Sequence, residues 1–153
     1  MYPLIGLFAT IVSFGLKSFF KHPRPKIFFQ EMIETGKIDI IEGVHAIGGY
    51  TSFPSGHTIS AFCLFGFAAY MFSSKSWFSK SLQLFCFLLA ILVGFSRIYL
   101  FQHFLKDVTL GAFLGLLLAI VLAVLCEKMN DGTGKWYERN LRNYKVKTAE
   151  NIA

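Results

Sequence analysis

Four long runs of apolar residues alternate with polar stretches along the chain. The runs cover approximately Tyr2 to Phe20, His57 to Phe72, Leu82 to Phe101 and Val108 to Cys126. At about 1.5 Å of rise per helical residue, runs of this length cross most or all of a hydrocarbon core of about 30 Å. The pattern therefore predicts an all-α integral membrane helical bundle with four transmembrane helices in this chain.

The longest internal polar stretch, residues 21–55, joins the first two runs. Its centre, Ile27 to Ile41, mixes phenylalanines and other apolar residues with carboxylates. That mixture is typical of an amphipathic helix lying on the membrane surface, and we expect a plain interfacial connection. The chain is thus predicted to have a membrane-embedded domain at 1–126, with the interfacial loop at 21–55, and a basic cytoplasmic tail at 127–153.

Composition supports a membrane setting. Hydrophobic residues make up 54% of the chain, and eighteen phenylalanines are more than a core this small could bury in water. The net charge of +6 does not indicate a nucleic-acid partner, because the cations fall between and after the apolar runs. The connection at 73–80 and the tail are basic, which assigns both to the cytoplasm. Alternation of spans then predicts that the 21–55 loop and the turn at 102–107 share the opposite face.

Three polar clusters stand at the ends of apolar runs on that shared face. The first is Lys17 followed, after six residues, by Arg24; the second is the run 54–57, Pro-Ser-Gly-His; the third joins Arg97, His103 and Asp107. Ionisable residues at membrane depth are costly and usually have a functional reason. Their convergence predicts an anion site.

The residue types in these clusters suit phosphoryl transfer. Lys17, Arg24 and Arg97 supply cations for the charge on phosphate oxygens. Ser55 and Gly56 precede an apolar run, so backbone N–H groups at a helix N-terminus should also face an anion, although Ser55 could simply cap the helix.

His103 and Asp107 are four residues apart, which would place them on one helical face if the fourth span begins there. A carboxylate that accepts the imidazole Nδ1–H leaves Nε2 free to attack phosphorus.

Metal binding is the competing use of the histidines and the aspartate. Three cations directed at one cavity would repel a divalent ion and favour an oxyanion. We therefore expect no metal and no cofactor. His22 and His45 belong to no cluster and are interpreted as loop residues. The Gly111-x-x-x-Gly115 pattern predicts close packing within the chain rather than a dimer interface, although a homo-oligomer stays open.

The three clusters resemble, in order and spacing, the signature motifs of the type 2 phosphatidic acid phosphatase (PAP2) superfamily, which also includes the vanadium haloperoxidases. The match spans Lys17 to Asp107. The resemblance implies that His103 is the nucleophile and Asp107 its orienting partner. It also implies that His57 is the general acid that later activates water.

The resemblance further implies a multi-pass protein of a bacterial inner membrane, with its active site on the periplasmic or extracellular face. Integral members usually carry six spans, so this chain resembles the catalytic half: a truncated copy, a fragment, or a short form paired with another subunit. The implied substrate is a lipid phosphate or pyrophosphate, such as undecaprenyl pyrophosphate, lipid A phosphate, phosphatidylglycerol phosphate or phosphatidic acid. A non-catalytic lipid-phosphate binder and a vanadate-dependent haloperoxidase are the alternatives. The intact histidines disfavour the binder, and the apolar runs disfavour the haloperoxidase.

Overall fold

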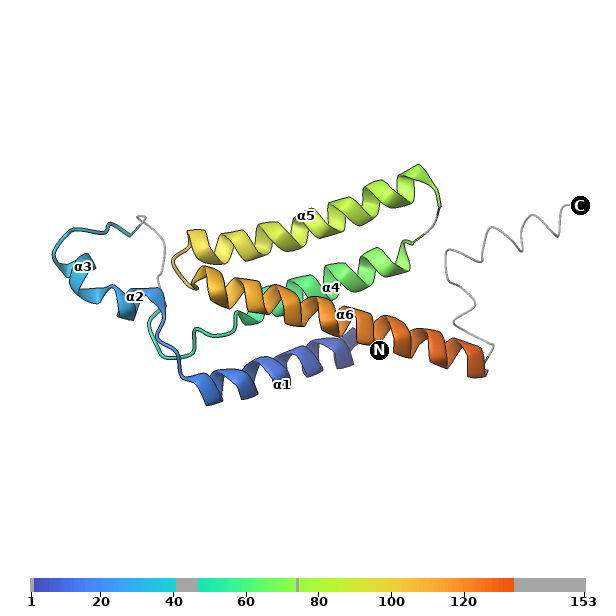
Figure 1. The fold of residues 1–153 in the computed structure, drawn as a ribbon, viewed down its shortest axis with the longest axis horizontal. Coiled ribbons are helices and arrows are strands. Elements are labelled where there is room, and N and C mark those ends of the chain that lie inside the picture. The colour runs from blue at the N-terminus through green and yellow to red at the C-terminus, as the bar shows by residue number, and fades with distance from the viewer. Residues whose placement is uncertain (1, 41–46, 74, 134–153) are drawn as a thin grey trace, which may run out of the picture.

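The computed structural model describes residues 2–40, 47–73 and 75–133, and every regular element in these ranges is a helix. This confirms the all-α prediction. Four long helices run side by side, and two short ones lie beyond one end of them (Figure 1). In chain order the helices are α1 (Tyr2–Phe20), α2 (Pro25–Phe28), α3 (Gln30–Glu34), α4 (Gly56–Met71), α5 (Trp77–Tyr99) and α6 (Leu105–Thr133).

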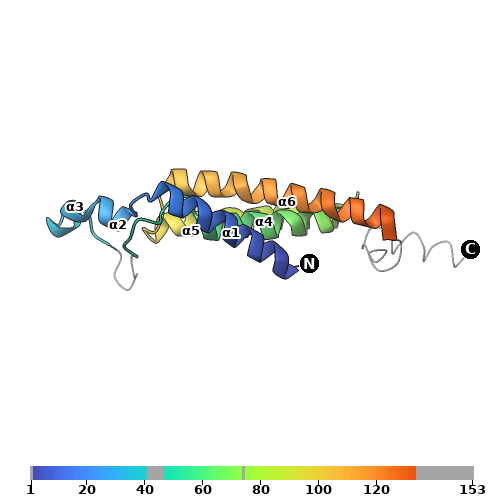
Figure 2. The same ribbon diagram turned by 90° about the horizontal axis from the view of Figure 1, so that it is seen from below.

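Helix α4 is the central element, because α1, α5 and α6 each pack more extensively against it than against one another. Figure 2, seen from below, shows α1 crossing the bundle beside α4. Ile59 and Cys63 of α4 form a buried core with Leu118 of α6. A helix with partners on several sides needs apolar residues around most of its circumference, which explains why α4 is apolar without a polar face.

Two glycines allow α6 to approach α4 closely. A Cβ atom added at Gly115 would lie 2.6 Å from the Ile59 carbonyl oxygen and 2.7 Å from Phe62 Cβ. One added at Gly111 would lie 2.9 Å from the Ser55 carbonyl oxygen. As predicted, the small-residue stripe packs within the chain.

Helices α5 and α6 are long and apolar enough to cross a membrane. The core helix of a soluble protein would be mostly buried, but the most apolar stretch of α5 is 17% buried and that of α6 is 28% buried. Large apolar side chains such as Leu92, Phe95, Phe113 and Ile120 face outward. This surface suits lipid contact. For α1 and α4 a membrane span stays a prediction.

Several predicted boundaries differ from the structure, including the start of α5 at Trp77 rather than Leu82. The amphipathic helix expected over 27–41 is instead the α2–α3 pair, interrupted at Phe29 and followed by Gly36 at φ 67°. Such a positive φ is favourable for glycine and ends helices. Residues 41–46 lie outside the described ranges.

Helix α6 does not end near Cys126 but continues to Thr133. Polar residues such as Glu127 and Lys128 propagate a helix as well as apolar ones do. The division into a membrane domain and a basic tail stays a prediction, and residues 134–153 lie outside the described ranges.

Candidate active site

The polar clusters predicted from the sequence meet at one end of the bundle. The C-terminal ends of α1 and α5 and the N-terminal ends of α4 and α6 all lie there, beside α2 and α3 (Figure 1).

The turn that leads to His103 is built by the end of α5. Gln102 N–H donates to the Arg97 carbonyl at 3.1 Å, and Phe101 N–H donates to the Ile98 carbonyl at 2.9 Å. This is the Schellman pattern, which needs a left-handed residue after the C-cap. Phe101 takes that conformation, with φ 55°, where glycine is usual. His103 N–H then bonds the same Arg97 carbonyl at 3.2 Å, so one carbonyl fixes the start of the turn.

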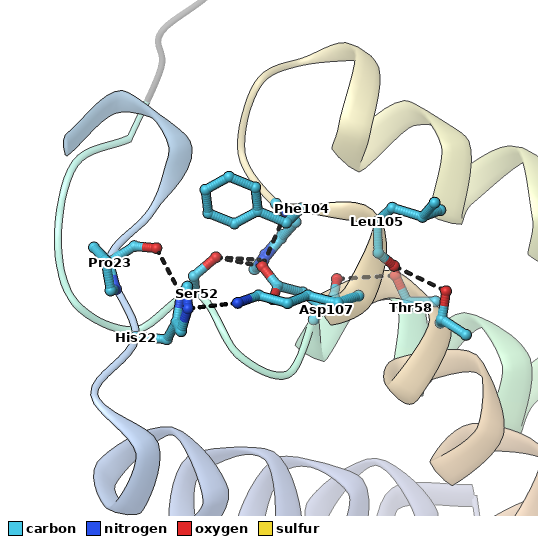
Figure 3. Close-up of polar contacts among 11 residues, drawn as sticks. His22, Pro23, Ser52, Thr58, Phe104, Leu105 and Asp107 are labelled. Atoms are coloured by element: carbon cyan, nitrogen blue, oxygen red, sulfur yellow. Dashed lines mark hydrogen bonds and ion pairs between the residues drawn. The ribbon is translucent and has the colours of Figure 1, made fainter. Parts of the chain in front are cut away.

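Asp107 sits at the third position of α6 and is fully buried. Its Oδ2 accepts from Phe104 N–H at 3.0 Å, as an acidic side chain does in a capping box. The same oxygen accepts from the Ser52 hydroxyl at 2.5 Å and lies 3.5 Å from His103 Nδ1. Figure 3 shows Ser52 directed at Asp107 beside Phe104. The carboxylate therefore joins the α5–α6 turn to the loop before α4.

The His103–Asp107 pair forms, but not by the route expected from the spacing. Helix α6 begins at Leu105, so His103 lies in the turn before the helix and does not share a helical face with Asp107. The pair depends on the turn geometry instead. His103 is 3% exposed, which holds the imidazole largely out of water.

Two loop segments pair through their backbones and position Arg24 and Ser52. Ser52 N–H donates to the His22 carbonyl at 3.0 Å, and Arg24 N–H donates to the Gly49 carbonyl at 2.9 Å. Arg24 thereby comes within electrostatic reach of Asp107. Burial lowers the pKa of the Arg24 guanidinium, and the nearby Asp107 charge opposes that shift. Arg24 Nε is buried and has no acceptor among the described residues.

The start of α4 is tied to the start of α6. Ser55 is the N-cap residue and its N–H donates to the Asp107 carbonyl at 3.0 Å. Its hydroxyl makes no capping bond and accepts from the Thr58 hydroxyl at 2.9 Å. The N–H groups of the first turn, from Gly56 onward, have no partner within a helix. The helix N-terminus can therefore serve an anion through Gly56 and His57 rather than through the Ser55 N–H.

The remaining predicted residues lie near the N-terminus of α4. Lys17 Nζ and the Ser13 hydroxyl both face Gly56, because a Cβ atom added there would lie 3.6 Å and 2.8 Å from them. His57 is exposed and lies within electrostatic reach of four basic residues: Lys17, Arg24, Arg97 and His103.

The guanidinium of Arg97 is held by the Ser96 hydroxyl at 3.1 Å and by Gln102 Oε1 at 3.2 Å. All eight predicted site residues thus come together.

Several polar residues take other roles. His22 Nε2 lies 2.6 Å from Lys106 Nζ, so His22 links the loop to α6, and His45 lies outside the described ranges. In the described ranges, no group of three or more His, Cys, Asp and Glu side chains could hold a metal ion. Metal independence stays a prediction.

Sequence reasoning missed two serines. Ser52 touches the Asp107 carboxylate and Ser13 faces Gly56. The only signal for Ser52 was its position two residues before the Pro54-Ser55-Gly56-His57 run. Ser13 stands inside an apolar run, where a hydroxyl usually bonds the preceding helical turn, so nothing marked it.

A family model described as the PAP2 superfamily matches residues 2–130. Phosphatidylglycerophosphatase B of Bacillus subtilis (strain 168) is 38% identical over 106 residues, which are 65% of this chain and 50% of that protein. Lipid phosphate phosphatase delta of Arabidopsis thaliana is 35% identical over 83 residues, 51% of this chain and 20% of that protein. The chain spans half the length of the first relative and a fifth of the second. No solved structure matches.

Proposed function

Since the chain belongs to the PAP2 superfamily, we propose that it is a membrane phosphatase that hydrolyses a lipid phosphate or lipid pyrophosphate through a phosphohistidine. One observation carries the proposal: a buried His103–Asp107 pair lies among three basic side chains that no carboxylate neutralises by an ion pair within the described ranges. A cluster of basic side chains of this kind suits phosphate binding, and the histidine adds a nucleophile that binding alone would not need.

In the proposed reaction, Lys17, Arg24 and Arg97 bind the phosphate oxygens together with the N-terminus of α4, where Ser55 and Gly56 lie. Fixed cations and N–H donors stabilise the charge that spreads over these oxygens in the transition state. The two arginines offer paired donors that match a phosphate edge.

The chemistry takes two steps. His103 Nε2 forms a bond to phosphorus while the bond to the departing lipid oxygen breaks, and His57 donates a proton to that oxygen. Water then attacks phosphorus and gives its proton to His57 as the N–P bond breaks. Inorganic phosphate leaves and His103 is regenerated. Asp107 keeps the Nδ1–H tautomer of His103 throughout.

A direct assay tests the proposal. The detergent-solubilised protein should release phosphate from at least one of four lipids, beginning with phosphatidylglycerol phosphate because of the first relative's name. EDTA should leave the rate within about twofold, since no step needs a metal, and vanadate should inhibit as a five-coordinate phosphate mimic. The other lipids are phosphatidic acid, undecaprenyl pyrophosphate and lipid A phosphate.

Tight binding of these lipids without phosphate release would leave only a lipid-phosphate binder. Vanadate-dependent oxidation of bromide would make the protein a haloperoxidase. Loss of activity on chelation, restored by a divalent ion, would contradict the mechanism.

We also propose that α1, α4, α5 and α6 all cross the membrane, with the active site on the non-cytoplasmic face. Lys37 and Lys75 are exposed and lie on opposite sides in this arrangement. In a Cys126→Ser background, Lys37→Cys should react with a membrane-impermeant thiol reagent from outside the cell and Lys75→Cys should not. The reverse labelling pattern would place dephosphorylation in the cytoplasm.

A further inference from the structure

Ser52 occupies a place in the site that the proposed reaction does not yet use. Its hydroxyl lies 2.5 Å from Asp107 Oδ2 and 3.5 Å from His103 Nδ1, and the residue has no exposed surface. Asp107 Oδ2 lies at the same 3.5 Å from that nitrogen. The Nδ1–H of His103 therefore faces two acceptors at once, a hydroxyl and a carboxylate oxygen.

The polarity of these contacts follows from their donors. An ionised carboxylate only accepts, so the Ser52 hydroxyl must donate its proton to Asp107. The lone pairs of the Ser52 hydroxyl oxygen are then free to accept a hydrogen bond from His103 Nδ1–H. Ser52 thus favours the tautomer in which His103 Nε2 carries no proton, which is the form that can attack phosphorus.

The surroundings hold Ser52 in place. Its N–H is bonded to the His22 carbonyl, in the loop pairing that also positions Arg24. Asp107 Oδ1, in contrast, is buried without a partner among the described residues, so the orientation of the carboxylate depends on its Oδ2 contacts. One of these contacts is the Phe104 N–H and another is Ser52. Without the Ser52 hydroxyl, only the Phe104 N–H and His103 would hold Asp107 Oδ2, so the carboxylate could rotate more freely.

We infer that Ser52 is a positioning residue of the active site: its hydroxyl orients the Asp107 carboxylate and shares the Nδ1–H of His103. The inference rests on the proposed phosphatase function. Figure 3 shows Ser52 directed at Asp107, near the start of α6. Ser52 does not touch the reacting phosphorus and acts only through the pair.

The first test compares Ser52→Ala, Ser52→Cys and the control Ser60→Ala, whose site on α4 is exposed. Ser52→Ala should slow phosphoenzyme formation about 10- to 100-fold, the range contributed by a hydrogen bond to a charged group, with KM within about twofold. Cysteine is a weak donor and its larger sulfur does not fit the 2.5 Å contact, so Ser52→Cys should be at least as slow as alanine. A wild-type rate of phosphoenzyme formation in Ser52→Ala would show that the hydroxyl is not needed and would overturn the inference.

A double-mutant cycle shows whether Ser52 acts through the carboxylate. In an Asp107→Asn background, Ser52→Ala should cause at most about a threefold further loss, because the group that Ser52 orients is already changed. A full additional loss of 10- to 100-fold would mean that Ser52 acts elsewhere.

A spectroscopic readout separates this inference from the proposed function. In protein labelled with 15N-histidine, the His103 signals, identified by their loss in His103→Ala, should report a protonated Nδ1 and an unprotonated Nε2. Ser52→Ala should shift them toward a mixture of tautomers, whether or not a phosphatase substrate has been found. If the wild-type protein is inactive but Ser52→Ala still shifts the His103 signals, the phosphatase function is refuted and the role of Ser52 in orienting His103 is supported. Unchanged His103 signals in Ser52→Ala would overturn the role of Ser52.

Discussion

Replacing His103 by alanine is expected to abolish phosphate release from every substrate of this protein. The imidazole is the nucleophile of the proposed reaction, and without it no covalent intermediate forms. His103 is 3% exposed and its Nδ1 faces Ser52 and Asp107, which leaves Nε2 as the ring nitrogen for the attack. The measurement is phosphate release together with trapping of an acid-labile, base-stable phosphohistidine, which should disappear with the activity.

The loss of rate in His57→Ala should depend on the leaving group of the substrate. A proton donated to the departing oxygen matters most when that oxygen is a poorly stabilised alkoxide, and such general acid catalysis contributes about 10²- to 10⁴-fold. Hydrolysis of a lipid monophosphate should therefore fall by that factor, while phosphorylation of the protein by an activated aryl phosphate falls much less. Since His57 should also activate the water, the aryl substrate should give a burst and then a slow steady rate, with labelled His103 accumulating.

Lys106→Ala is the control for both histidines, because Lys106 is exposed and contacts His22 rather than the pair. It should retain at least about half of the wild-type rate. Residual turnover of the lipid by His103→Ala would remove His103 as nucleophile. Equal losses for both substrates in His57→Ala, without a burst, would mean that His57 positions the phosphate and transfers no proton.

Gly115→Ala should destabilise the folded protein more than the same change at any other described helical glycine. The new Cβ would lie 2.6 Å from a backbone oxygen and 2.7 Å from Phe62 Cβ, so α6 must move away from α4. Overpacking of this kind costs about 1–3 kcal/mol against a gain of about 1 kcal/mol from replacing a helical glycine by alanine, so the net loss should be up to about 2 kcal/mol. Because Asp107 is on α6, activity should fall as well.

The control is Gly15→Ala on α1, where an added Cβ meets nothing within 4 Å. It should leave stability unchanged or raise it slightly. Unfolding can be followed by the reaction of the buried thiols of Cys63 and Cys86 with a fluorogenic thiol reagent on heating. Equal midpoints for the two variants would show that α6 does not pack against α4 through Gly115.

The long helices could be predicted from the sequence because their signal is local. A run of apolar residues such as 108–126 needs no knowledge of its neighbours to indicate a helix in a bilayer. The exact ends could not be predicted, because polar residues such as Glu127 extend α6 without interrupting it. The 27–41 segment misled the prediction because an amphipathic composition persists through the break at Phe29, where backbone geometry ends the helix.

The site could be predicted in composition but not in geometry. The clusters around Arg24, His57 and His103 were recognisable by residue type and spacing. The contacts of Ser52, in contrast, connect positions 55 residues apart, and a serine in a polar loop carries no local signal for them. The left-handed Phe101 that aims His103 was also hidden, since glycine would be the expected residue there.

The bond between the Ser55 N–H and the Asp107 carbonyl has a consequence for biosynthesis. A ribosome makes Lys17 and the 49–57 segment before it makes residue 107. Until α6 packs against α4, the Ser55 amide and the Ser52 hydroxyl lack their acceptors, and α4 lacks the neighbour that covers Ile59. Packing of this one helix completes the core and the His103–Asp107 pair together, so the newly made chain forms its core and its proposed nucleophile site in the same step.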